Sequence, residues 1–210
     1  MIRVLIADDH ALVRHGLRQI LNVEREIETV GEAQTGNEVL DVLRDVKVDT
    51  LVLDITMPGR NGLETLKEVR RLYPNIAVIV LSMHPKDQYA VRVLKAGASA
   101  YISKESAPDE LVYAIRSSYL GRKYITSDVA ELLADYVQHG SSADPHHSLS
   151  DREFEVFSMI ASGKGVSQIA EELKLSVKTV STYKARIAEK TGLSTSSDIT
   201  RYFLERGLDK

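Results

Sequence analysis

Apolar residues follow two alternating patterns along the first 120 residues of the chain. Short, nearly continuous apolar runs predict strands of a parallel sheet that is buried on both faces, and the longer segments between them have the spacing of amphipathic helices. The predicted strands span residues 2–7, 28–32, 50–53, 76–81 and 99–102. The predicted helices span residues 12–22, 36–45, 63–72, 86–96 and 107–120. This order predicts an α/β domain of the (βα)5 type, covering residues 1–120.

The pattern changes after residue 120. A helix is predicted near residues 126–138, inside a linker that spans residues 121–147. The adjacent histidines His146 and His147 lack a third ligand at a suitable spacing, so we expect a solvated hinge there rather than a metal site. Residues 148–210 then predict a small all-α domain of four helices. These helices span residues 151–162, 166–173, 177–190 and 195–206.

Composition limits the number of domains and the cellular compartments that are possible for this chain. Its 210 residues are enough for two domains, and the absence of cysteine excludes disulfides and thiol chemistry and suits a reducing compartment. No apolar stretch approaches the roughly 18 residues that a membrane span needs, and the N-terminus lacks the pattern of a secretory signal. We therefore expect a cytoplasmic protein without a membrane partner.

Three carboxylates stand where predicted strands end. Asp8 and Asp9 follow the first strand, and Asp54 follows the third. Parallel sheets bind ligands at the carboxyl ends of their strands, so we expect the three acids to share one pocket. Closely spaced carboxylates are costly unless a cation is bound or one of them stays protonated. Oxygen ligands of this kind suit Mg²⁺, which keeps waters and also accepts phosphate oxygens.

Two further strand ends carry the groups that a phosphoryl group needs. Ser82 follows the fourth strand with a hydroxyl donor, and Lys104 follows the fifth strand with an ammonium. This set resembles the receiver domain of bacterial two-component response regulators over residues 1 to about 120. The matching residues are Asp8 and Asp9, Asp54 within Asp54-Ile55-Thr56-Met57-Pro58-Gly59, Ser82, Tyr101 and Lys104. The resemblance implies the flavodoxin-like receiver fold.

The resemblance also implies a role for each matching residue. Asp54 would accept a phosphoryl group from the histidine of a sensor kinase, and Ser82 and Lys104 would bind the phosphoryl oxygens. Ser82 and Tyr101 are the expected switch residues, and Tyr101 would swing inward to report phosphorylation. The expected ligands of Mg²⁺ are Asp8, Asp9, Asp54 and the backbone carbonyl of Thr56. One departure is Glu105, which follows Lys104 where many receivers have a proline.

The C-terminal domain contains two helices separated by a short turn, and the second begins after Ser176, a good cap. Residues 147–210 carry 10 Lys and Arg against 9 Asp and Glu, so DNA binding would depend on local clustering of charge. With Val180 and Ile187 buried, a rotation of 100° per residue predicts which side chains face outward. The predicted outward face holds Lys178, Thr182, Ala185 and Glu189, flanked by Ser181 and Arg186. The predicted inward neighbours are Val177, Tyr183, Lys184 and Thr191.

That outward face is small, hydroxylated and basic, which suits the major groove of DNA. Residues 148–208 resemble the LuxR-type helix-turn-helix of the NarL/FixJ response regulators, in which the helix matching Val177 to Lys190 enters the groove. The resemblance rests on four sequence segments: Leu149 to Val156, Ile160 to Lys164, Gln168 to Leu173 and Lys178 to Tyr183. The DNA-contacting residues are expected to be Lys178, Thr179, Ser181, Thr182, Ala185, Arg186 and Lys190. The string from Thr179 to Arg186 looks most like the BvgA and EvgA branch.

The resulting hypothesis is a response regulator that accepts a phosphoryl group on Asp54, dimerises and binds promoter DNA. It implies as partners a sensor histidine kinase, double-stranded promoter DNA, RNA polymerase and, on phosphorylation, a second copy of the chain. We expect no enzyme activity beyond self-phosphorylation and slow autodephosphorylation at Asp54. A phosphatase with an aspartyl intermediate is a second possibility, although Thr56 stands where common aspartyl phosphatases carry a second acid. A third is a binding protein that does not respond to phosphorylation.

Overall fold

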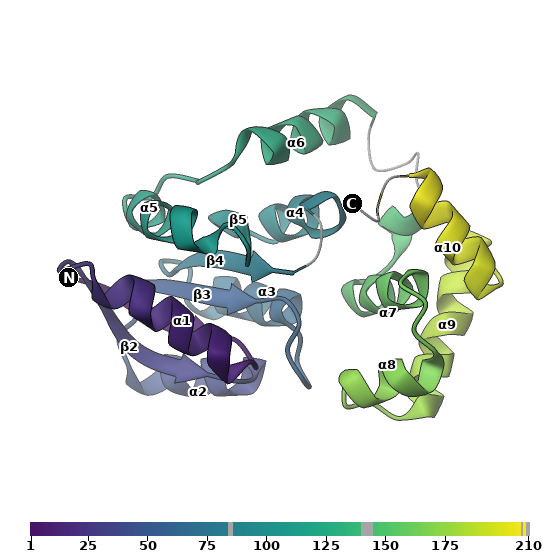
Figure 1. Ribbon diagram of the computed structural model, residues 1–210, viewed down its shortest axis with the longest axis horizontal. Helices are drawn as coiled ribbons and strands as arrows, with labels where there is room; N and C mark the ends of the chain where they lie inside the picture. The colour runs from purple at the N-terminus through teal and green to yellow at the C-terminus, as the bar shows by residue number, and fades with distance from the viewer. Residues whose placement is uncertain (84–85, 140–144, 207, 209–210) are drawn as a thin grey trace. The chain divides into compact units, whose positions relative to one another are not determined.

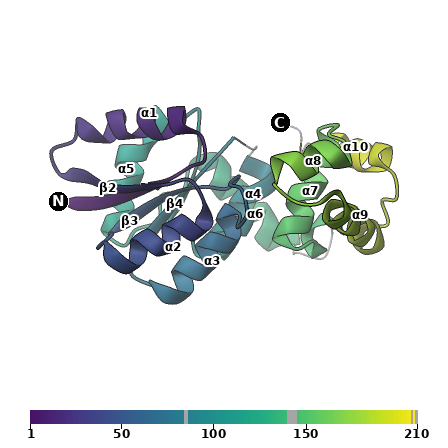
Figure 2. The same ribbon diagram turned by 90° about the horizontal axis from the view of Figure 1, so that it is seen from below.

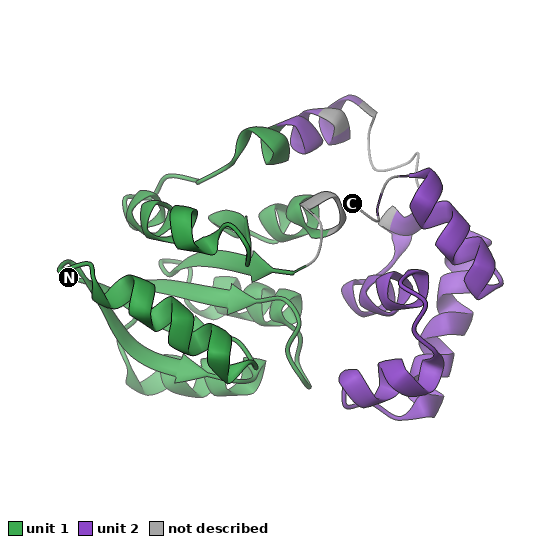
Figure 3. Cartoon of the chain, in the orientation of Figure 1, with its two compact units in different colours: residues 1–130 green, residues 131–210 purple. Residues whose placement is uncertain are grey.

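A computed structural model of the chain describes residues 1–83, 86–139, 145–206 and 208 (Figure 1). Its internal contacts divide it into two compact units, residues 1–130 and residues 131–210 (Figure 3). Within the described part, no helix is both long enough and apolar enough to cross a membrane.

The first unit is built on one sheet of five parallel strands, in the order β2-β1-β3-β4-β5. The strands are β1 (Ile2–Ala7), β2 (Ile27–Ala33), β3 (Thr50–Asp54), β4 (Ala77–Ser82) and β5 (Ala100–Ser103). Each predicted strand is confirmed to within one residue at either end. The order of the strands reverses beside β1, and this brings the carboxyl ends of β1 and β3 next to each other.

Five helices cover the two faces of this sheet, as the apolar periodicity predicted. They are α1 (Ala11–Asn22), α2 (Gly36–Asp45), α3 (Gly62–Leu72), α4 (Lys86–Lys95) and α5 (Ala107–Tyr119). Figure 2 shows α1 and α5 on one face and α2 and α3 on the other. Leu21 of α1 and Leu111 and Ile115 of α5 are fully buried in a core that includes Val4 and Ile79 of the sheet. This core holds the sheet in place. Polar groups can therefore occupy the edge of the sheet where the strands end.

The loop after β3 folds back tightly onto the strand end. The Gly62 amide donates to the Ile55 carbonyl at 2.8 Å. A Cβ atom at Gly62 would lie 2.0 Å from the Asp54 carbonyl oxygen and 2.7 Å from the Ile55 Cα. Both are backbone atoms that cannot rotate away, so this approach requires glycine.

The described part of the second unit is helical. Its elements are η1 (Pro145–Ser148), α7 (Asp151–Ala161), α8 (Val166–Glu172), α9 (Val177–Thr191) and α10 (Ser196–Glu205), and the boundary between the units falls within α6 (Ser127–His139). The predicted capping box at the start of α7 is present, with Ser150 and Glu153 bonded reciprocally. Residues 140–144 of the predicted linker lie outside the described residues.

The expectation of a solvated hinge is wrong at His146. This residue lies in η1 and is only 6% exposed. Its Nδ1 lies 2.7 Å from the Tyr202 hydroxyl, and its ring lies against Phe154 within an aromatic cluster completed by Phe157 and Phe203. The composition of the segment suggested solvent, but an imidazole can be buried when a hydroxyl satisfies its ring nitrogen.

We predict that Gly62→Ala lowers the free energy of unfolding of this chain by roughly 1–3 kcal/mol, because the added methyl group overpacks the end of β3. Urea unfolding followed by circular dichroism measures the change. Gly16→Ala is the matched control, since a Cβ there meets no atom within 4 Å and Gly16 lies in the exposed face of α1. A Gly62→Ala variant as stable as the wild type would contradict the prediction.

Candidate functional site

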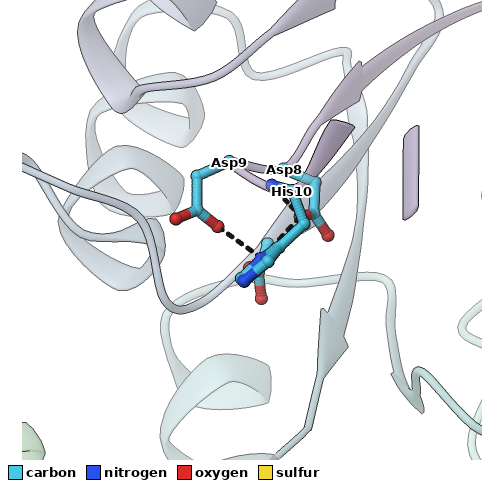
Figure 4. Close-up of side chains that lie close together, drawn as sticks. Asp8, Asp9 and His10 are labelled. Atoms are coloured by element: carbon cyan, nitrogen blue, oxygen red, sulfur yellow. Dashed lines mark hydrogen bonds and ion pairs between the residues drawn. The ribbon is translucent and has the colours of Figure 1, made fainter. Parts of the chain in front are cut away.

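The three predicted acids do share one pocket. Asp8 and Asp54 are only 1% and 2% exposed, whereas the Asp9 side chain is 33% exposed. One carboxylate oxygen from each acid, together with a ring nitrogen of His10, lies within 4.8 Å of the others. Figure 4 shows Asp8, Asp9 and His10 gathered in the loop after β1.

Lys104 lies between the two buried carboxylates. Its Nζ is 2.6 Å from Asp8 Oδ2 and 2.8 Å from Asp54 Oδ2, and its side chain is 7% exposed. The Lys104 amide donates to the carbonyl of Ser82, the fully buried last residue of β4. The structure thus brings residues from the ends of β1, β3 and β4 together with a lysine that follows β5.

Burial sets the electrostatics of this pocket. Desolvation raises the pKa of Asp54 to about 6, with the Asp8 charge adding to the effect and with Lys104 and the Thr56 amide opposing it. Burial alone would lower the pKa of Lys104, but its attraction to Asp54 and Asp8 raises that pKa overall. One ammonium balances only one of the three carboxylates, so the pocket keeps a formal charge of −2 when all three are ionised.

The pocket fits Mg²⁺ better than a softer metal. Its carboxylates are hard oxygen donors, and no described cysteine or pair of histidines competes with them. A divalent cation would also neutralise the charge that Lys104 leaves uncompensated. Because Asp9 remains partly exposed, the pocket is open to solvent on the side of the β1–α1 loop.

His10 and Arg14 support the pocket, although neither was singled out from the sequence. The His10 amide donates to Asp8 Oδ1 at 2.8 Å, and its Nδ1 lies 2.8 Å from Asp9 Oδ1. The buried Arg14 donates from Nη1 to the Asp8 carbonyl at 2.7 Å and from Nε to Glu32 at 3.0 Å. Both residues lie at the start of α1, directly after the acids. The sequence signal that could have identified Arg14 is a basic residue on the buried face of an amphipathic helix.

Two further predicted residues can be placed. Tyr101 is 2% exposed and lies in β5 opposite Val80 of β4, so its side chain is buried here. The peptide bond before Glu105 is trans, as are the other described peptide bonds.

The second candidate site is the outward face of α9. Val180 and Ile187 are fully buried, and the six predicted outward residues are all exposed: Lys178, Ser181, Thr182, Ala185, Arg186 and Glu189. Of the predicted inward neighbours, Tyr183, Lys184 and Thr191 are half-buried. The prediction for Val177 is wrong, because this residue is 52% exposed. Val177 begins the helix, where the packing partners of later turns are absent.

The hydroxyls on this face already donate within the helix. Ser181 Oγ donates to the Val177 carbonyl and Thr182 Oγ1 to the Lys178 carbonyl, both at 2.9 Å. Each hydroxyl oxygen keeps lone pairs that can still accept a hydrogen bond. Lys190 differs from the other expected DNA contacts, since its Nζ lies 2.6 Å from Glu153 Oε2.

Comparisons with known proteins identify both units. The model of the response regulator receiver domain matches residues 4–116, and that of the luxR family of bacterial regulatory proteins matches residues 147–203. The chain is a response regulator. Membership in this family makes it a phosphorylation-dependent, DNA-binding regulator of transcription, with a receiver that implies a histidine kinase as its partner.

Several relatives match this response regulator along its whole length. The response regulator UvrY of Escherichia coli K12 is 39% identical, with 99% of this chain and 96% of that protein covered. The response regulator GacA of Pseudomonas aeruginosa is 36% identical, with 99% and 98% covered. Among solved structures, the Salmonella typhimurium RcsB response regulator is 28% identical with a TM-score of 0.72, covering 97% of each chain. RcsB bound to the promoter rprA with the phosphomimetic BeF₃⁻ is 27% identical with a TM-score of 0.67, covering 96% and 97%.

The raised pKa of Asp54 predicts how the stability of this response regulator depends on pH. The ordinary pKa is 3.8, so between about pH 4 and pH 6 the folded chain holds a proton that the unfolded chain releases. The free energy of unfolding of the wild type, relative to Asp54→Asn, should therefore fall by roughly 3 kcal/mol as pH rises through this window. Urea unfolding of both proteins from pH 4 to pH 7 in a chelating buffer measures this difference. A difference that stays level or grows with pH would contradict the assigned shift.

Proposed function

We propose that Asp54 is the phosphoacceptor of this response regulator. The observation that carries the proposal is the position of its carboxylate, which is buried at the end of β3 with Oδ2 only 2.8 Å from the Lys104 ammonium. A nucleophilic carboxylate needs a neighbouring cation that can also stabilise the charge of the phosphoryl oxygens. Asp8 is the other buried carboxylate of this pocket, and Lys104 contacts it as well.

In the transfer from a sensor histidine kinase, an Asp54 oxygen forms a bond to phosphorus while the bond from phosphorus to the imidazole nitrogen breaks. The electron pair of that bond stays on the imidazole. Lys104 and the Ser82 hydroxyl bind the phosphoryl oxygens. Asp8, Asp9, Asp54 and the Thr56 carbonyl would hold Mg²⁺, whose positive charge would help to neutralise the phosphoryl oxygens.

Phosphorylation changes the partners of Lys104. A phosphoryl group brings a charge of about −1.5 to −2 and strong acceptor oxygens into the pocket. Lys104, now shared between Asp8 and Asp54, gains a stronger partner there. Tyr101 is buried in β5, three residues before Lys104. It is our candidate for the switch residue that transmits this change. The response favours a homodimer, because two recognition helices read two half-sites together.

The outward face of α9 is the proposed DNA-reading surface. Lys178 and Arg186 supply positive charge, and the exposed Ser181, Thr182 and Ala185 are short enough for close approach to base edges. Thr179, half-buried in the first turn, completes this set. RcsB has been solved in complex with DNA, which supports the same mode for this chain. RNA polymerase is the proposed partner at the promoter.

The proposed domains are a receiver over residues 1–120, a connecting segment over residues 121–147 and a DNA-binding domain over residues 148–210. The matched family models, residues 4–116 and 147–203, support these limits. The string from Thr179 to Arg186 supports placing the recognition helix in the BvgA and EvgA branch. We place the protein in the cytoplasm, where the kinase domain and the DNA are both accessible.

We expect Asp54→Asn to abolish labelling by radioactive acetyl phosphate, because the amide cannot form the acyl phosphate. Acid-quenched filter binding and intact-protein mass spectrometry measure the label. Asp41→Asn is the matched control, since Asp41 is an exposed carboxylate on α2 that pairs with Arg44 on the same helix. Stable, stoichiometric labelling of Asp54→Asn would refute the assignment.

The same preparation separates this function from a phosphatase. A response regulator should take label from acyl phosphates or a phosphohistidine donor and leave phosphomonoesters such as p-nitrophenyl phosphate unchanged. Continuous turnover of such an ester, lost in Asp54→Asn, would instead support the phosphatase with an aspartyl intermediate.

A further inference from the structure

Lys190 occupies a different part of α9 from Lys178 and Arg186, the cationic residues of the outward face. At 100° per residue it lies about 60° from the buried Ile187, toward the packed side, and about 100° from Glu189 on the outward face. Its Nζ makes an ion pair with Glu153 Oε2 at 2.6 Å. Lys178, by contrast, is exposed in the first turn of the helix. The two lysines are twelve residues apart, or about 18 Å along the helix axis.

Glu153 is an unusual partner for a lysine of a DNA-reading helix. Its side chain is only 3% exposed, whereas that of Lys190 is 39% exposed. The same Oε2 atom accepts from the Ser150 amide at 2.8 Å, as part of the capping box of α7. Burial works to raise the pKa of Glu153, but Lys190 and the Ser150 backbone outweigh it and hold that pKa below its usual value. The carboxylate is therefore charged and bonded on both sides.

The Glu153–Lys190 ion pair joins the start of α7 to the end of α9, and each charge is favourable at its own helix end. Glu153 lies in the first turn of α7 and Lys190 in the last turn of α9, so each charge also compensates the dipole of its own helix. The two helices pack against each other. Recognition helices contact bases mainly through their N-terminal residues, and Lys190 is near the opposite end.

We propose that Lys190 is a positioning residue and not a phosphate contact: with Glu153 it ties the end of α9 to the start of α7 and so fixes the orientation in which α9 presents its outward face. A phosphate contact would require Lys190 to leave a buried carboxylate without its cation, which is costly. The tie instead persists in the complex. The ion pair affects DNA affinity by orienting the outward face of α9, which includes Lys178. Lys190 itself places no charge against the DNA.

Salt dependence distinguishes the two roles. Each lysine that neutralises a phosphate adds about 0.9 to the slope of log K against log salt for duplex DNA. We expect Lys190→Gln to weaken binding roughly fivefold at every salt concentration and to leave the slope unchanged. Lys178→Gln is the matched control and should lower the slope by about 0.9. Binding is measured by fluorescence anisotropy with full-length protein, Mg²⁺ and BeF₃⁻, on a duplex that the wild type selects from a random-sequence library.

Glu153→Gln tests the same ion pair by removing the charge of the partner of Lys190. Glutamine can still accept from the Ser150 amide, so the start of α7 is kept and only the charge is lost. If the pair positions α9, this variant weakens binding as Lys190→Gln does, and the double variant is no weaker than either single one. Circular dichroism confirms that each variant remains helical.

Three results would overturn the proposal. The first is a salt slope that falls by about 0.9 in Lys190→Gln, as expected for a phosphate contact. The second is an unchanged or higher affinity in Glu153→Gln, because removing a carboxylate near DNA helps binding when that carboxylate has no positioning role. The third is an unchanged affinity in Lys190→Gln.

Discussion

The structure depends on the burial of Asp8, Asp54 and Lys104 at the carboxyl edge of a parallel sheet. Ionised groups are costly to bury, and one ammonium shared at 2.6 and 2.8 Å between two carboxylates only partly offsets that cost. The raised pKa of Asp54 is the sign of the remaining imbalance. A pocket in this condition favours binding of a cation and responds strongly when a phosphoryl group changes its charge. The packed core beneath the edge holds the strands that carry these residues.

The second unit makes a different use of charge. Its core of aromatic side chains and the buried Val180 and Ile187 fix α9, and the charged and hydroxylated residues on the opposite face stay exposed. One buried carboxylate, Glu153, is bonded both to the cap of α7 and to Lys190. Charge in this unit therefore holds a surface in place, whereas charge in the receiver is poised to change partners.

Much of this could be predicted from the sequence, because strand ends and apolar periodicity are local signals. The strands are right to within one residue, and Ser82, Lys104 and the three acids converge because parallel strands end at one edge. Contacts between residues that are distant in the sequence could not be predicted in this way. His146 is buried because Tyr202, 56 residues away, satisfies its ring. The ion pair of Lys190 with Glu153, 37 residues away, likewise had no local signal in the sequence. Val177 is exposed although its helical angle points inward, since it lies at the helix end.

In the proposed function, phosphorylation of the pocket around Asp54 controls DNA reading by α9. The most direct test is the dissociation constant for the selected duplex, measured with and without BeF₃⁻ in Mg²⁺ buffer, for the wild type and for Asp54→Asn. We expect BeF₃⁻ to tighten binding of the wild type by about tenfold or more and to leave Asp54→Asn unchanged. Equal affinities of the wild type with and without BeF₃⁻ would contradict this expectation and would favour a binding protein that does not respond to phosphorylation.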